Sequence, residues 1–315
     1  MANIITVPLP QDLPTNWVYG QTIGPQGTDV GLTQRHGYNY LMEQVNASQQ
    51  AAQELGDAVG NSNGIASLGN NGQMPYAQTP HLTSRVTVYV DASTGNDSNP
   101  GTQGQPFKTI QAAVNSLPKD LSTYNANINI ADGTYDEDVN IIGFHAGTLD
   151  YGLNIIGNQS NASAVQVKSL NIRSCSAVIS LRSFTVIGTS APLLNIGNSS
   201  VLVNNLTLLP AGNMEYSYSY FAVNIGLNSN VRLYNFTVDL SNNQSSGFSG
   251  LQVFLSVISI FSITVKNCQT GIMVGDNSNY YCGIALFYDQ PTFENNTVDT
   301  TKSGAGSIIS GLEGQ

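Results

Sequence analysis

The stretch NIGNSSVLVNNLTL at residues 195–208 returns as NIGLNSNVRLYNFTV at residues 224–238. Its ending is echoed by SFTV at residues 183–186, SITV at residues 262–265 and, more faintly, NTV at residues 296–298. The central threonine therefore falls at positions 185, 207, 237, 264 and 297, with gaps of 22, 30, 27 and 33 residues. Such a period, built from short β-branched runs, indicates a solenoid, in which stacked coils bury a core that no single coil could bury.

The apolar residues inside the repeat alternate, which favours strands over helices. At residues 231–240 the alternation slips by one position at Asn235, and such a slip turns the inward face of a strand outward. An asparagine in the left-handed conformation would form a tight corner and absorb the slip. We therefore expect about six or seven coils between residues 126 and 300. A β-sandwich would explain the strands but not the repeated stretch.

The composition excludes several classes of function. Charged residues make up 10% of the 315 residues, and the net charge of −10 disfavours nucleic acid or an anionic membrane as a partner. No apolar run reaches the roughly 18 residues of a membrane span, and residues 1–8 lack the pattern of a secretory signal. Cys175, Cys268 and Cys282 show no metal-ligand spacing and predict buried free thiols. We expect no cofactor and no metal.

The chain divides by composition into four parts. These are an N-terminal arm and helix at residues 1–59, a Gly- and Asn-rich linker at 60–85, a cap of the solenoid at 86–142 and the coils at 143–315. The arm is rich in proline and carries Trp17 and Tyr19, whose large apolar surfaces must be covered. They are predicted to attach the chain to a partner; the alternative is that they fold back on their own domain.

Residues 34–59 predict the one clear helix. Its apolar positions recur with alternating steps of three and four, which is a heptad pattern. These positions are Tyr38, Leu41, Val45, Ser48, Ala52, Leu55 and Val59. The narrow stripe favours self-association as a short coiled coil, through all of these residues except Ser48, and we expect a homotrimer. The alternative is a single helix that packs on the end of the solenoid.

The cap segment supplies a resemblance. A strand at residues 86–90 is followed by GNDSNPGT at 95–102, PFKTI at 106–110 and GTY at 133–135. This ordered set resembles the N-terminal cap of pectin-lyase-like proteins. The resemblance implies an all-β, right-handed single-stranded parallel β-helix with an N-terminal extended arm and a short α-helix. It also implies that a short helix plugs the open end of the core.

The N-terminal segment carries a second resemblance. Residues 31–46, GLTQRHGYNYLMEQVN, resemble the start of phage and prophage tail-associated proteins from Gram-positive hosts. This resemblance implies a virion protein, made in the host cytoplasm, whose residues 1–59 bind other tail proteins and whose β-helix projects outward.

Catalytic residues are not assigned. Enzymes of the pectin-lyase-like fold act on acidic polysaccharides, with paired carboxylates about 5–10 Å apart or with a base beside Ca²⁺. None of their motifs is present, and the spacing of Asp239, Glu294 and Asp299 selects no pair. In the densest acidic run only Asp136 and Asp138 share a strand face, which predicts a solvated turn. Asp91 and Asp97 lie in an Asp- and Asn-rich loop that fits either Ca²⁺ or ordinary turns.

One insertion suggests a binding surface. The coil between the two clearest repeats is lengthened by residues 210–221, and solenoids place binding loops in such insertions. The tyrosines predicted to bind glycan are Tyr216, Tyr218 and Tyr220, with Tyr280 and Tyr281 two coils further on. Tyrosine stacks on sugar rings, but the same surface could pack subunits of a trimer.

The sequence therefore predicts a phage tail fibre or tailspike-like protein that presents a β-helix to host-surface polysaccharide. A depolymerase on the same fold, either a lyase or a glycoside hydrolase, is the second interpretation. A bacterial surface adhesin is the third.

Overall fold

The computed structural model describes residues 43–55, 57, 79–147, 152–216, 220–243, 247–275, 282–302 and 306–311, without the side chain of Tyr216. The chain divides into two compact units, Met1–Thr79 and Pro80–Gln315. In the first unit, residues 43–55 and 57 are helical, and the side chains of these helical residues are all exposed. Val45 and Leu55, two positions of the heptad, are 46% and 57% exposed. The coiled coil stays a prediction, and Tyr38, Leu41, Val59, Trp17 and Tyr19 lie outside the described residues.

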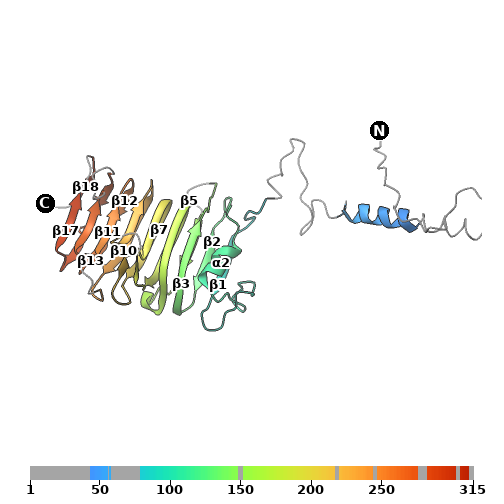
Figure 1. Ribbon diagram of the computed structural model, residues 1–315, viewed down its shortest axis with the longest axis horizontal. Helices are drawn as coiled ribbons and strands as arrows, with labels where there is room; N and C mark the ends of the chain where they lie inside the picture. Colours follow the sequence, from blue (N-terminus) through green and yellow to red (C-terminus); the bar gives the residue numbers. More distant parts are fainter. Residues whose placement is uncertain are drawn as a thin grey trace, which may run out of the picture. The chain divides into compact units, whose positions relative to one another are not determined.

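The second unit begins with the cap. Strand β1 (Val86–Val90) leads through a long loop into helix α2 (Ile110–Ser116), whose buried side chains are Ile110, Ala113 and Val114. The Thr109 hydroxyl accepts a hydrogen bond from the Ala112 amide at 3.1 Å and so caps the helix. Helix α2 lies against the first strands of the solenoid (Figure 1).

The coils follow as a succession of short strands. They are β2 (Ala126–Ile130), β3 (Gly133–Ile142), β4 (Gly152–Ile156), β5 (Val165–Val186), β7 (Leu194–Leu208), β9 (Phe221–Gly226), β10 (Asn230–Asp239), β11 (Ser249–Val253), β12 (Val257–Ile260), β13 (Ile263–Lys266), β14 (Thr270–Val274), β15 (Ile284–Phe287), β16 (Thr292–Glu294), β17 (Val298–Lys302) and β18 (Ile308–Ser310). Two short strands, β6 (Ser190–Ala191) and β8 (Glu215–Tyr216), pair outside the main sheet, and η2 (Ala162–Ala164) is a 3₁₀ turn.

Each coil pairs with the next in parallel along three faces. The first face stacks β1, β2, β4, the middle of β5 and of β7, and then β10, β12, β15 and β18. The second face stacks the ends of β5, β7 and β10 with β13 and β16. The third face stacks β3, the earlier parts of β5 and β7, and then β9, β11, β14 and β17.

The core is a set of columns that run through the coils. On the first face one column contains Ala126, Leu153, Ile179, Val201, Val231, Ile258 and Ala285, each in register with the next and each buried. The chain makes six full turns between the first and the last residue of this column. This confirms the expected parallel β-helix and agrees with the lower of the expected six or seven coils. Figure 1 shows these strands side by side along the length of this unit.

The corners explain the slip in the alternation. Asn205 and Asn235 have φ of 57° and 47°, and Ser183 occupies the corresponding corner of the coil before with φ 58°. These left-handed residues turn the chain from the first face to the second, as predicted. Thr185, Thr207, Thr237 and Thr264 stack in register, which confirms the repeat.

The prediction that Thr297 continues this column of threonines was wrong. The partner of Thr264 is Thr292, not Thr297, so the interval is 28 residues and not 33. The faint NTV echo instead lies at the turn into β17, where the amide of Thr297 donates to the carbonyl of Cys268. The turns from β13 to β14 and from β16 to β17 have the same length, residues 267–269 and 295–297, so the NTV match is a chance resemblance and does not mark the register.

Candidate functional site

A groove opens at the corner where the chain passes from the second face to the third. Its volume is about 450 Å³, within the usual range of small-ligand sites. Three successive coils line it with Asn243, Gly247, Phe248, Asn267, Cys268, Gln269, Asn295 and Thr297. None of these side chains carries a formal charge at neutral pH.

A ladder of amides runs along one wall of the groove. The Asn267 side-chain amide donates to Asp239 at 2.8 Å, and the Asn295 amide donates to the Asn267 oxygen at 3.3 Å. Asn267 and Asn295 hold left-handed corners with φ of 60° and 55°, so each coil presents its amide at the same position. The ladder leaves amide hydrogens and lone pairs that can serve a polar ligand.

A row of charges lies on the second face beside the groove. Asp239, Lys266 and Glu294 are in register on successive coils, and Lys266 Nζ lies 3.3 Å from Asp239 Oδ2. Burial acts to raise the pKa of Asp239, but hydrogen bonds from Asn267, Ser241 and Lys266 hold this pKa below its usual value. Asp239 is therefore ionised at neutral pH.

The predicted tyrosine loop meets the groove at one residue. Tyr220 is 53% exposed. Its ring centroid lies 5.7 Å from that of Phe248, which lines the groove. The backbone of Tyr216 belongs to β8. Tyr218, Tyr280 and Tyr281 lie outside the described residues, so Tyr220 is the one tyrosine of the predicted glycan-binding set with a described side chain, and it lies against the groove lining.

Three aromatic rings that the sequence analysis did not select form a stack at the corner between the first and second faces. The ring centroid of Phe261 lies 4.3 Å from that of Tyr234 and 4.6 Å from that of Tyr288, and in each pair the ring planes differ by 6°. Tyr288 is 60% exposed. The available signal was the spacing, because these residues recur at intervals of 27. The stack stabilises the corner and presents aromatic surface to solvent.

The acidic run of the cap separates into a surface pair and a structural residue. Asp136 and Asp138 both contact Lys168 Nζ, at 3.9 and 3.1 Å, which confirms that they share a face. The hydrogen bond from Ser169 lowers the pKa of Asp138, and Lys168 lowers this pKa further. Glu137 points the other way and accepts hydrogen bonds from the amides of Ile110 and Gln111 at the start of α2. Burial raises the pKa of Glu137.

The two aspartates considered for Ca²⁺ are engaged in turns. Asp91 accepts four hydrogen bonds from the amides and hydroxyls of Ser93 and Thr94, which hold its pKa well below the usual value. Asp97 accepts from Lys108 and Thr109 at the start of α2. Among the described residues no three acidic, histidine or cysteine side chains gather as a metal site would require.

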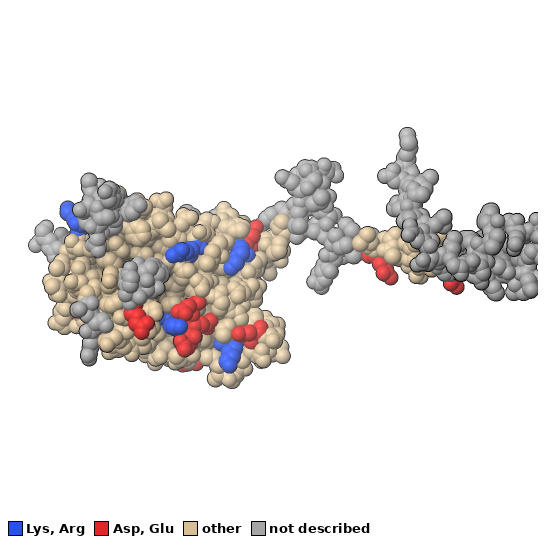
Figure 2. Space-filling model, in the orientation of Figure 1, with Lys and Arg blue, Asp and Glu red and all other residues tan. Residues whose placement is uncertain are grey.

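The remaining surface is sparsely charged. Figure 2 shows one face of the β-helix, most of which is uncharged, with one cluster of acidic side chains around a basic one and a few other charged side chains elsewhere. Cys175 and Cys268 are buried free thiols, as expected, whereas Cys282 is partly exposed. Among the described helices none has the length and apolar character needed to cross a membrane.

A chain whose strands pair coil upon coil along three parallel faces defines a parallel β-helix protein. A family model described as "Protein of unknown function (DUF1565)" matches residues 93–313, and the chain belongs to this β-helix-type family. The match begins in the cap loop and continues through the coils. Neither the search of curated proteins nor the search of solved structures found a match.

Proposed function

We propose that this chain is a tail-associated phage protein that binds a host-surface glycan in the groove between the second and third faces. In this proposal residues 1–59 attach it to other tail proteins, and the helix at residues 34–59 assembles it as a homotrimer. The protein then acts in the virion as a receptor-binding fibre or spike, without a cofactor.

The observation that carries the proposal is the chemistry of the groove. Amide side chains both donate and accept hydrogen bonds, which suits the hydroxyl groups of a sugar. Phe248 lines the groove but is only 5% exposed, and the exposed ring of Tyr220 lies against it, so the aromatic surface beside the amides comes mainly from Tyr220. Aromatic rings pack on the C–H face of sugars. A glycan that runs along the β-helix would meet the same amide on two successive coils, at Asn267 and Asn295.

The attachment half of the proposal rests on the N-terminal unit. Residues 31–46 resemble the start of phage tail-associated proteins, and the described helix leaves Val45 and Leu55 exposed on its heptad stripe. An exposed stripe of this kind suits self-association. A bacterial adhesin would use the same groove, and detection of the chain in purified virions by mass spectrometry separates the two.

A glycan array tests the binding half with the full chain. Asn295→Gly and Thr297→Val remove polar groups from the groove, and glycine keeps the left-handed corner. The matched control is Asn205→Gly, at a left-handed corner outside the groove lining. We expect the groove variants to lose signal for the glycan that the wild type binds, while the control keeps it. Equal signal in all variants would contradict the groove as the site.

One observation favours a glycoside hydrolase as the second candidate. Asp239 and Glu294 stand two coils apart in register, which is roughly 10 Å at the usual strand spacing. That separation is at the upper end for an inverting hydrolase, about 6.5–9.5 Å. Asp239 is ionised and could serve only as the base, which leaves Glu294 as the acid.

The glycoside hydrolase hypothesis can be tested directly by measuring polysaccharide cleavage. If it holds, the full chain releases reducing ends from host polysaccharide, and Asp239→Asn and Glu294→Gln each abolish the release. Binding without release supports the receptor-binding function.

A further inference from the structure

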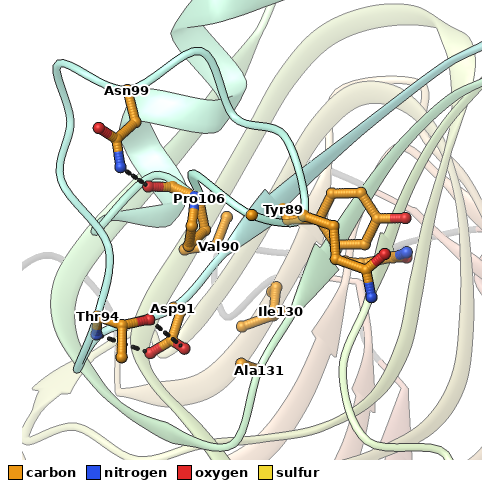
Figure 3. A pocket seen from close by; sticks show the side chains of 11 residues that line it. Tyr89, Val90, Asp91, Thr94, Asn99, Pro106, Ile130 and Ala131 are labelled. Carbon is orange, nitrogen blue, oxygen red and sulfur yellow. Dashed lines mark hydrogen bonds between the residues drawn. The ribbon is translucent and has the colours of Figure 1, made fainter.

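A second hollow lies in the cap, between the loop after β1 and the outer edge of the first coil (Figure 3). Its volume is about 390 Å³, again within the range of small-ligand sites. Strands β1 and β2 form one side, and the loop forms the other. The lining residues are Tyr89, Val90, Asp91, Thr94, Asn99, Gln103, Gly104, Pro106, Asn129, Ile130 and Ala131.

The loop around this cap pocket is held in place by its own hydrogen bonds. The Asn99 side chain donates to the Pro106 carbonyl at 2.8 Å, and Thr94 donates to both carboxylate oxygens of Asp91 (Figure 3). Ser93 donates to one of these oxygens as well. The Tyr89 amide donates to the Gly101 carbonyl at 2.9 Å. Gly101 has φ 76°, and a Cβ there would lie 2.2 Å from the Phe107 ring. The pocket is therefore formed in advance of any ligand.

Three polar side chains in the lining have donors and acceptors that no described residue pairs with. Tyr89 and Asn129 are in register on β1 and β2 and are half-buried, and Gln103 comes from the loop. Within the described part of the chain, none of these three side chains makes a hydrogen bond to another residue. They place one phenol and two amides around the pocket, and each of these groups can both donate and accept hydrogen bonds.

The charges and the apolar lining narrow the class of ligand. The lining contains no lysine or arginine, and its one charged residue, Asp91, repels anions. Val90, Ile130 and Pro106 are buried and give the pocket an apolar wall. An apolar wall combined with uncharged donors and acceptors suits a neutral ring that bears hydroxyl groups.

We propose that the cap pocket is a second saccharide site, which takes a single neutral sugar unit. Tyr89 and Asn129 bind its hydroxyl groups, and the apolar wall packs against the ring. The site is separate from the groove and does not depend on glycan binding there.

Saturation-transfer NMR and calorimetry on the full chain test this site. The probes are glucose, galactose and N-acetylglucosamine, with glucuronate as the anionic comparison. Tyr89→Phe removes only a hydroxyl and Asn129→Leu removes only an amide, so neither disturbs the hydrogen bonds of the loop. The matched controls are Tyr124→Phe and Gln166→Leu, a tyrosine and a strand amide outside the pocket lining.

We expect at least one neutral sugar to bind, and the loss of one hydrogen bond to weaken binding by about fivefold in each pocket variant. The controls and the groove variant Asn295→Gly should bind that sugar like the wild type. Failure of every neutral sugar to bind, stronger binding of glucuronate, or equal affinity in the pocket variants would overturn the proposal. Loss of binding in Asn295→Gly alone would also overturn it, while it would support the groove.

Discussion

The columns of the core and the wall of the groove are made from the same coils, yet they follow different rules. In the core each position must fill a fixed space, so apolar residues recur in register from coil to coil, as from Val201 to Val231 and Ile258. At the groove only the corner amide repeats, as Asn267 and Asn295, whereas the equivalent positions Phe248, Gln269 and Thr297 share no common residue type. The difference teaches that the core needs the same kind of side chain in every coil, whereas the groove combines one repeated amide with residues that vary from coil to coil.

The largest expected effect comes from opening a core column. Phe236 is 1% exposed and stacks between Leu206 and Ile263, so Phe236→Ala should reduce the free energy of unfolding by about 3–5 kcal/mol. Thr237→Ala, one residue on and outward-facing, should change it by less than about 1 kcal/mol. Urea denaturation measures both. A similar loss in the two variants would contradict the alternation of inward and outward residues.

The aromatic stack should have an intermediate effect. Phe261→Ala removes two ring contacts, each worth about 0.5–1.5 kcal/mol, and should lower the free energy of unfolding by about 1–3 kcal/mol. The exposed Tyr124 provides the control, as Tyr124→Ala removes an aromatic side chain outside the stack. If both variants unfold at the same urea concentration, the stack contributes nothing.

The corners should respond to backbone conformation rather than to side-chain size. Asn235 has φ 47°, so Asn235→Ala should destabilise the protein by about 1–2 kcal/mol, whereas Asn235→Gly should be nearly neutral. Melting temperatures of the two variants measure the difference. A glycine variant that melts as low as the alanine variant would show that the asparagine side chain, not the left-handed turn, is required.

The sequence was sufficient for the parts of the fold that obey the repeat. The slip at Asn235 predicted a left-handed corner, and the stretch at residues 195–208 predicted the register with residues 224–238. Thr297 was assigned wrongly because the short NTV match was followed instead of the 28-residue register, in which Thr292 occupies the repeated position.

The groove could not be read from the sequence because its wall is assembled from three coils. Asn267 and Asn295 are 28 residues apart, which was a usable signal, but asparagine is frequent in this chain and the corner role of each was not evident. The sequence analysis instead predicted the binding surface at the insertion of residues 210–221, because of its tyrosines. Tyr220, the one tyrosine of that set with a described side chain, contacts the groove lining through Phe248.

The smallest expected effect on stability is a pH effect in the cap. Hydrogen bonds from Ser93 and Thr94 hold the pKa of Asp91 below its ordinary value of 3.8. The folded protein therefore binds fewer protons than the unfolded chain in acid, so the contribution of Asp91 is complete above pH 3.8 and is lost as the pH falls. Because Asp91 is partly exposed and solvent screens its interactions, this contribution should stay below about 1 kcal/mol.

Thermal melts between about pH 5 and pH 2.5 measure that contribution, over the range in which a carboxyl group titrates. Asp91→Asn cannot titrate, so its melting temperature should fall less steeply with decreasing pH than that of the wild type. Parallel curves for the two proteins would show that Asp91 has the same pKa in the folded and unfolded chains.

Hydrogen exchange of the full chain, with and without the host glycan identified on the array, tests the central claim most directly. The account predicts that the glycan slows exchange at residues 247–248, 267–269 and 295–297, which line one groove from three coils. The core columns, already protected, should not change. Protection confined to other surfaces, or no change while the glycan is bound, would contradict the assignment of the groove.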